Sequence, residues 1–241
     1  MFLTLGRTED ALKKVQDGLK IMRVLAEADP SDARKQRALT GSHYKIGTVL
    51  QAFGEFRAAA ESFDAAAAIV RSMIERGINV EQSTSDLASL ESSARSARLG
   101  EAAIGDWEKL LQHPAESLPA VLDLRGTQFT KRSHFTEAAQ AATKLRELEN
   151  ADNGHLYNAA CVFSLCAASI RAAEGSELTA EQTTQRQTWI NEAIAALKQS
   201  IAKGWTDFAH MQQDPDLTIL RDLPEFKALI PAPPAPEPPK N

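Results

Sequence analysis

The segment 46–69, IGTVLQAFGEFRAAAESFDAAAAI, is rich in alanine and contains only three aromatic residues. Small side chains let two helices approach closely, while a few large ones fill the space between neighbouring turns. Gly47 and Ala59 fall where two such helices would cross, and Gly54 falls where the chain would reverse. The segment therefore predicts two closely packed helices joined by a tight turn.

The composition of the whole chain favours an all-α fold. Only 6% of the 241 residues are aromatic, and no hairpin dipeptide lies between alternating runs of Val, Ile and Thr. The net charge of -5, without a basic stripe, argues against nucleic acid binding. No apolar run approaches the roughly 20 residues of a membrane span, so no membrane insertion by this chain is expected. Residues 1–5 are too short for the core of a signal peptide.

Apolar residues at spacings of three and four predict helices along most of the chain. The first stripe consists of Leu12, Val15, Leu19, Met22 and Leu25, and the segment 29–32 ends that helix. The later helices are expected up to residue 53, then at 56–76, 80–99, within 100–111, and at 118–129, 135–148, 155–173 and 180–203. Short helical turns are expected at 206–230, followed by an extended, proline-rich and disordered tail at 231–241.

The order of residues in the opening segment resembles the tetratricopeptide repeat. A small residue lies in the first helix, an aromatic residue opens the second, an alanine follows three residues on, and a further aromatic follows four residues later. A second copy has Ser133 in the turn where glycine is usual, and its other residues are Gly126, Phe129, Phe135, Ala138 and Ala142. A half copy opens the chain with Gly6, Ala11, Val15 and Leu19. A further copy begins at 156–160 with Phe163 and continues at 189–201, and Trp107 marks a degenerate copy near Gly105.

The resemblance implies an all-α, right-handed helical superhelix of antiparallel helix pairs with a C-terminal helical cap. Its copies are spaced more widely than the usual period of about 34 residues, which longer helices would accommodate. The expected organisation is repeats at 1–150 with the first one incomplete, a last helix pair plus capping helices at 151–230, and the tail at 231–241. The alternative is an alanine-rich helical bundle without repeats. Because a repeat cannot bury its face alone, we expect a further helix upstream of Met1 in a longer bacterial protein.

The C-terminal third has a second resemblance. The strings at 157–167, 193–205 and 207–230, the last containing DPDL and LRDLPEF, are similar to the repeat-containing tail of certain bacterial serine/threonine protein kinases. The chain itself has no glycine-rich phosphate loop, His-Arg-Asp or Asp-Phe-Gly motif. A kinase domain that binds ATP would therefore lie upstream of Met1, and no enzyme activity is expected within these residues.

Several residues of the types that form chemical sites are expected to have structural roles instead. Asp216 is expected to cap a helical turn rather than to bind a cation, because a calcium loop needs more oxygen ligands and a glycine. Cys161 and Cys166 lack a second pair and an evident base, so they are expected to be buried thiols in a reducing, cytoplasmic compartment. The histidines, His210 among them, are scattered and are expected at the surface. We therefore expect no catalytic residue, metal or cofactor.

The surface expected to bind a partner is the concave face of the superhelix, which the first helix of each pair lines in the tetratricopeptide family. The resemblance places Asn158 where some members hydrogen-bond a peptide. Asp123 and Thr127 occupy positions where a clamp for a C-terminal carboxylate would need lysine and asparagine, so an extended or basic peptide is expected instead. The expected peptide-binding residues are Tyr44, Thr48, Gln51, Asp123, Thr127, Thr130, Lys131, Tyr157 and Asn158.

The predicted function is that of a non-catalytic scaffold for protein–protein interaction, whose partner is a protein or peptide. The alternative is a regulatory or substrate-recruiting tail of a serine/threonine kinase. A small independent enzyme ranks last, because no constellation of acid, base or metal ligands can be assembled.

Overall fold

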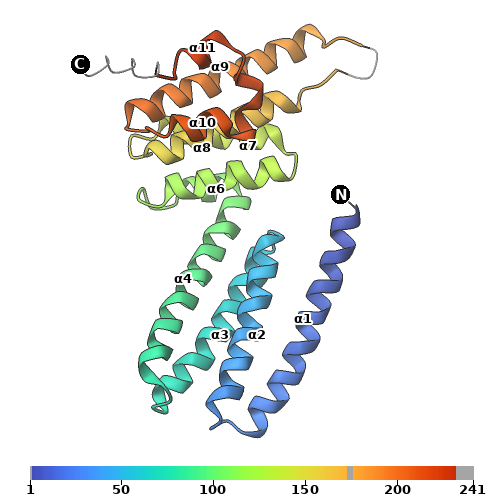
Figure 1. Cartoon of the computed structure of the whole chain (residues 1–241), viewed down its shortest axis with the longest axis vertical. Coiled ribbons are helices and arrows are strands. Elements are labelled where there is room, and N and C mark those ends of the chain that lie inside the picture. Colours follow the sequence, from blue (N-terminus) through green and yellow to red (C-terminus); the bar gives the residue numbers. More distant parts are fainter. Residues whose placement is uncertain (1, 173–175, 232–241) are drawn as a thin grey trace, which may run out of the picture. The chain divides into compact units, whose positions relative to one another are not determined.

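The computed structural model describes residues 2–172 and 176–231, and every regular element in these ranges is a helix (Figure 1). The all-α prediction is therefore confirmed. Residues 232–241, which make up nearly all of the predicted disordered tail, lie outside the described residues. The chain divides into two compact units, Met1–Gly105 and Asp106–Asn241. The predicted boundary at residue 150 concerned repeats rather than compact units, and it stays a prediction.

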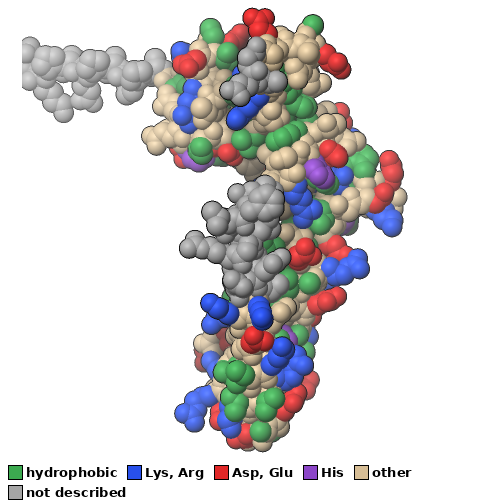
Figure 2. Space-filling model, turned by 90° about the vertical axis from the view of Figure 1, so that its right-hand side faces the viewer, with side chains coloured by type: hydrophobic (Ala, Val, Ile, Leu, Met, Phe, Trp, Pro, Cys, Tyr) green, Lys and Arg blue, Asp and Glu red, His purple; other side chains and the backbone are tan. Residues whose placement is uncertain are grey.

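Unit 1 consists of four long helices that run alternately up and down in Figure 1. They are α1 (Phe2–Ala28), α2 (Ala33–Ala52), α3 (Phe56–Glu75) and α4 (Val80–Ile104). Each helix packs against the next one in sequence, so α3 has a neighbour on both sides. Figure 2 faces the side of unit 1 that α1 forms, and it shows hydrophobic side chains gathered near the lower end.

The alanine-rich sequence of α3 follows from its central place between α2 and α4. Four of its alanines, Ala59, Ala60, Ala66 and Ala67, are buried, Ala59 and Ala66 completely. The two rings of the helix point at glycines: a Cβ added to Gly47 of α2 would lie 2.7 Å from Phe63, and one added to Gly100 of α4 would lie 2.3 Å from Phe56. Small residues therefore set the close spacing of the three helices.

Unit 2 is built around α8 (Asn153–Ser169), which packs against α6 (Leu118–Lys131), α7 (Phe135–Glu147), α9 (Ala180–Ala202) and the 3-10 helix η1 (Pro215–Leu220). Ten residues of α8 are buried, which accounts for its nearly continuous apolar sequence. Three short helices complete the unit: α5 (Trp107–Leu111), α10 (Phe208–Gln213) and α11 (Pro224–Lys227).

The same turn joins α2 to α3 and α6 to α7. Gly54 and Ser133 both have a left-handed backbone, with φ of 76° and 62°. In the first turn the N–H of Glu55 donates to the carbonyl of Leu50 at 2.9 Å, and in the second the N–H of His134 donates to Phe129 at 2.8 Å. The predicted equivalence of Ser133 to a turn glycine is confirmed, and the two helix pairs share one local design.

Some predicted helix ends were wrong for identifiable reasons. Helix α4 does not end at residue 99 but continues through Gly100 to Ile104, because this glycine makes room for the Phe56 ring instead of breaking the helix. Helix α8 begins at Asn153, where the carboxylate of Asp152 accepts a hydrogen bond from the N–H of His155. In the described part of the chain, no helix has both the length and the apolar character needed to span a membrane.

Candidate functional site

The main candidate site is a pocket of about 450 Å³ in unit 2, which we call the C-terminal pocket. Helices α6 and α8 form one part of it, and the segment from Trp205 to Asp216 folds back to form the other. The pocket is lined by Thr127, Thr130, Lys131, Tyr157, Asn158, Cys161, Val162, Leu165, Trp205, His210, Asp214 and Asp216.

Five of the nine predicted peptide-binding residues line this pocket, namely Thr127, Thr130, Lys131, Tyr157 and Asn158. A sixth, Asp123, lies next to it and accepts a hydrogen bond from the amide of Asn158 at 2.9 Å. Burial raises the pKa of the Asp123 carboxyl, and the bond from Asn158 partly offsets this. The packing of α6 against α8 therefore brings together these six residues, which the resemblance to the tetratricopeptide repeat assigned to one face.

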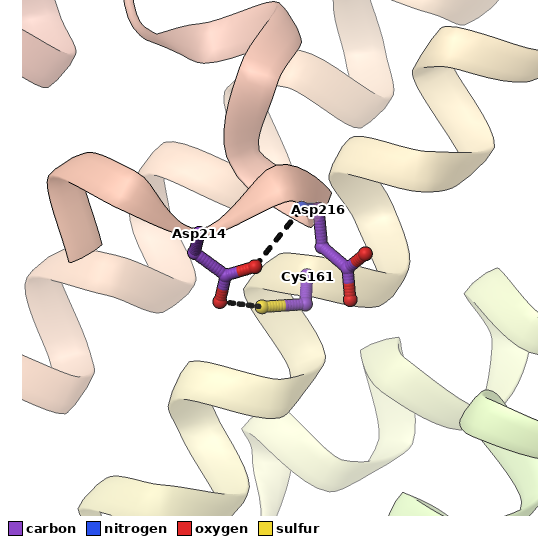
Figure 3. Close-up of side chains that lie close together, drawn as sticks. All are labelled: Cys161, Asp214 and Asp216. Atoms are coloured by element: carbon purple, nitrogen blue, oxygen red, sulfur yellow. Dashed lines mark hydrogen bonds between the residues drawn. The ribbon is translucent and has the colours of Figure 1, made fainter. Parts of the chain in front are cut away.

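Asp214 is the structural centre of the pocket and is only 8% exposed. One carboxylate oxygen accepts the N–H of Asp216 at 2.9 Å and so caps η1. The other accepts the hydroxyl of Tyr157 at 2.8 Å. It also lies 3.7 Å from the Cys161 sulfur (Figure 3). His210 Nε2 is 3.4 Å from that same oxygen. The sequence assigned the capping role to Asp216, but the side chain that caps is that of Asp214.

An aromatic wall stands beside this carboxylate. The rings of Tyr157 and Trp205 stack with their centroids 4.1 Å apart and an interplanar angle of 12°. The His210 ring lies 5.6 Å from that of Tyr157 and 6.2 Å from that of Trp205. Burial, followed by the hydrogen bond to Asp214, raises the pKa of the Tyr157 phenol far above its ordinary value. Tyr157 therefore remains a hydrogen-bond donor rather than a base.

Cys161 is held as a thiol by its surroundings. Burial raises its pKa well above the ordinary value, and the carboxylates of Asp214 and Asp216 raise it further. A nucleophilic cysteine needs the opposite environment, because the thiolate is the reactive form. Cys161 is accordingly a packing residue of α8 that donates a weak hydrogen bond.

The ligand atoms of Cys161, Asp214 and Asp216 lie within 4.8 Å of one another, as a metal site would require (Figure 3). Two facts oppose that use. Both oxygens of Asp214 already hold the fold together, one at the cap of η1 and one at Tyr157. The thiol would also have to lose its proton against two neighbouring carboxylates.

Asp216 is an acidic group in the pocket with unused binding capacity. Among the residues that the structure describes, its carboxylate accepts no hydrogen bond and forms no ion pair, although the residue is half-buried. Burial raises its pKa, and the charge of Asp214 raises it further. A cationic group placed in the pocket would relieve both effects.

A second pocket of about 320 Å³ lies between α2 and α4 of unit 1 over a floor of α3, and we call it the N-terminal pocket. Of the predicted residues only Tyr44 lines it. Thr48 and Gln51 do not: the Thr48 hydroxyl donates to the Tyr44 carbonyl, and the Gln51 amide donates to Ser96 of α4. The Gln51 bond ties α2 to α4 beyond the pocket, and the assignment of Thr48 and Gln51 to peptide binding stays a prediction. The remaining lining residues are Arg37, Thr40, Gly41, Val70, Met73, Ser83, Asp86, Ser89 and Leu90.

Sequence reasoning missed Trp205, His210, Asp214 and Asp216 as members of the C-terminal pocket. They lie far from α6 and α8 in sequence. The helices of this segment are too short for the spacing of their apolar residues to show which other helix they cover. Of the terminal elements, η1 packs against α8. The one available clue was the Asp214-Pro215-Asp216 sequence. It predicted a capped turn but not the helix against which this turn packs.

Comparison with known proteins found no matching family model, no similar curated protein and no similar solved structure. The tetratricopeptide and kinase-tail resemblances therefore stay predictions.

Proposed function

We propose that this chain is a non-catalytic protein-interaction module of tetratricopeptide type, in which the C-terminal pocket holds a peptide segment of the partner. The observation that carries the proposal is the convergence of α6, α8 and the 205–216 segment on one pocket with both apolar and polar walls. Trp205 and Leu165 offer apolar contact, while Asn158 and Thr130 offer polar groups that fix orientation. The repeated turn at Gly54 and Ser133 supports the repeat architecture.

The charges of the pocket favour a peptide that carries a basic side chain. Asp214 and Asp216 line the pocket together with a single lysine, Lys131. The Asp216 carboxylate has no partner among the described residues, and the stacked rings of Tyr157 and Trp205 stand close by. A guanidinium or ammonium group is stabilised by carboxylates and by aromatic faces.

A peptide-display selection on the immobilised full chain tests this proposal. We expect enrichment of peptides with arginine or lysine next to an apolar residue. Trp205→Ala should lower the affinity of a selected peptide at least tenfold, because it removes the apolar wall. Tyr44→Ala, in the N-terminal pocket, is the matched control and should leave the affinity unchanged. Selection of no peptide, or equal binding by both variants, would refute the assignment of the pocket.

A second proposal, that the chain is the tail of a serine/threonine kinase, rests on the terminal DPDL and LRDLPEF strings alone. Blotting source cells with an antibody against this chain tests it. A band at 26.2 kDa would exclude a kinase domain on the same polypeptide. A much heavier product that transfers phosphate from ATP after capture by the antibody would support it.

A further inference from the structure

Helix α1 has two apolar faces, of which only one packs within the chain. Towards α2 it places Val15, Leu19 and Met22, all half-buried, and Ala26, which is buried. The other face leaves three large apolar side chains in water: Ile21 is 59% exposed, Val24 65% and Leu25 44%. The sequence placed Leu25 in the packed stripe, and the structure turns it outward.

The exposed residues form one continuous strip, because spacings of three and four lie on one side of a helix. Gly18, one turn before Ile21, belongs to the same strip, and a Cβ added there would meet nothing within 4 Å. A shallow hollow lined by Lys20, Ile21, Val24 and Leu25 follows it. The strip therefore has a notch at Gly18 and a ridge at Val24. Figure 2 faces this side of unit 1.

Charges flank the strip with opposite signs at its two ends. Lys13 and Lys14 precede it and Glu27 follows it, and all three are exposed. Asp29, which also follows it, is already paired with Lys35 at 3.2 Å, and within the strip the exposed Asp17 pairs with Lys20 at 3.1 Å. If two α1 helices lie antiparallel across a two-fold axis, the lysines of one lie near Glu27 of the other. A parallel arrangement would place like charges together.

From the exposed strip, the notch and the charges, we infer that α1 is a self-association surface whose partner is a second copy of this chain. The two α1 helices pair antiparallel with Ile21 at the two-fold axis, so that Val24 of each copy covers Gly18 of the other. The paired strip runs from residue 13 to 28, about 24 Å of helix at roughly 1.5 Å per residue. Because so narrow an interface is smaller than the roughly 1,200 Å² of standard ones, we expect association in the micromolar range.

Sedimentation velocity of the full chain from about 1 to 300 µM tests the association, a range chosen around the affinity expected for so small an interface. The wild type should shift from monomer to dimer, and Ile21→Glu should remain monomeric with unchanged helix content. Val80→Glu is the matched control, since Val80 is an exposed apolar residue of the same unit, at 46%, and its loss should not alter the dimer. A wild type that stays monomeric throughout, or an Ile21→Glu variant that still dimerises, would overturn the inference.

Disulfide trapping tests the orientation. In the antiparallel pair a Gly18→Cys chain should cross-link to a Val24→Cys chain, and neither variant should cross-link to itself. The native thiols contribute little background, because both are buried and burial raises the pKa of Cys166 to about 12. Self-cross-linking of each variant would mean a parallel pair and would contradict the proposed geometry.

A charge exchange tests the ends of the strip. Lys13→Glu and Glu27→Lys should each weaken self-association, because each brings like charges together twice in a symmetric pair. An equimolar mixture of the two variants should associate more strongly than either alone, since the mixed pair restores both contacts. A mixture no stronger than its components would overturn the antiparallel assignment.

Discussion

At the scale of single residues, Asp214 connects the fold to the candidate site. Its carboxylate caps η1 through the N–H of Asp216 and accepts the hydroxyl of Tyr157 from α8. The terminal segment thus stays on α8, and Trp205 stays stacked on Tyr157. The same carboxylate also gives the pocket its acidic character. Asp214 is thus both the capping residue of η1 and a residue that lines the pocket. Replacing Tyr157 and replacing Asp216 should therefore have different effects on stability and on binding.

Replacing Tyr157 by Phe tests the bond to Asp214. The ring stack survives, but a buried carboxylate oxygen loses its strongest donor, which we expect to lower the free energy of unfolding by about 1–3 kcal/mol. Urea denaturation measures it. Tyr44→Phe is the control, because Tyr44 is 45% exposed, and its change should be close to zero. Equal effects in both variants would contradict the role given to the Tyr157 hydroxyl.

Replacing Asp216 by Asn tests the unused carboxylate. Its pKa is raised in the folded state from an ordinary value of 3.8, so the folded chain holds this proton more tightly than the unfolded chain. As the pH rises from 3.8 through the raised pKa of the folded chain, ionisation of Asp216 therefore lowers the free energy of unfolding. At neutral pH, Asp216→Asn should raise the melting temperature and weaken binding of a basic peptide.

The wild type should also lose affinity for that peptide as the pH falls through the raised pKa of Asp216, while Asp216→Asn should show a flatter profile. Calorimetric titration between pH 4 and 8, a window spanning the ordinary carboxyl range and the values above it, measures this. Asp222→Asn serves as control, because that carboxylate is fully exposed. Binding that strengthens at low pH would contradict a cation site.

At the scale of elements, the sequence could predict where the helices lie. It could not show which glycine ends a helix and which lies inside one. Gly54 and Gly100 look alike in sequence, yet the first has φ of 76° in a turn and the second lies within α4 beneath a ring. Only contact with Phe56, distant in sequence, decides between them. Periodicity therefore placed the helices, whereas their exact ends depended on tertiary packing and on caps such as Asp152.

The shared turn predicts opposite effects for exchanging its central residue. A left-handed backbone is strained for serine and easy for glycine. Ser133→Gly should therefore stabilise unit 2 by up to about 1 kcal/mol, while Gly54→Ser should destabilise unit 1 by a similar amount. Thermal unfolding of the two variants measures both. Changes of the same sign would mean that the two turns are not equivalent.

The close approach of α2 and α3 predicts the effect of one methyl group. Gly47→Ala places a Cβ 2.7 Å from the Phe63 ring, and we expect a loss of about 1–3 kcal/mol from overpacking. Gly41→Ala in the same helix meets nothing within 4 Å, so it should stabilise α2 by up to about 1 kcal/mol. Urea denaturation of the pair separates packing from helix propensity. A stable Gly47→Ala variant would contradict the packing argument.

At the scale of the whole molecule, the sequence could predict five of the twelve residues that line the candidate site. The resemblance to the tetratricopeptide repeat placed Thr127, Lys131 and Asn158 on one face, and in the structure all three line one pocket. Four further lining residues come from the 205–216 segment, which returns across α8 through contacts such as Tyr157 with Asp214. Those contacts join residues more than fifty positions apart, and single-sequence patterns do not encode them.

The binding of a basic peptide in the C-terminal pocket can be followed in the full chain by hydrogen–deuterium exchange, with and without a selected peptide that carries arginine. We expect slower exchange confined to α6, α8 and the segment 205–216, with α2 and α4 unchanged. Slower exchange at the N-terminal pocket, or none in α8 under saturating peptide, would contradict it.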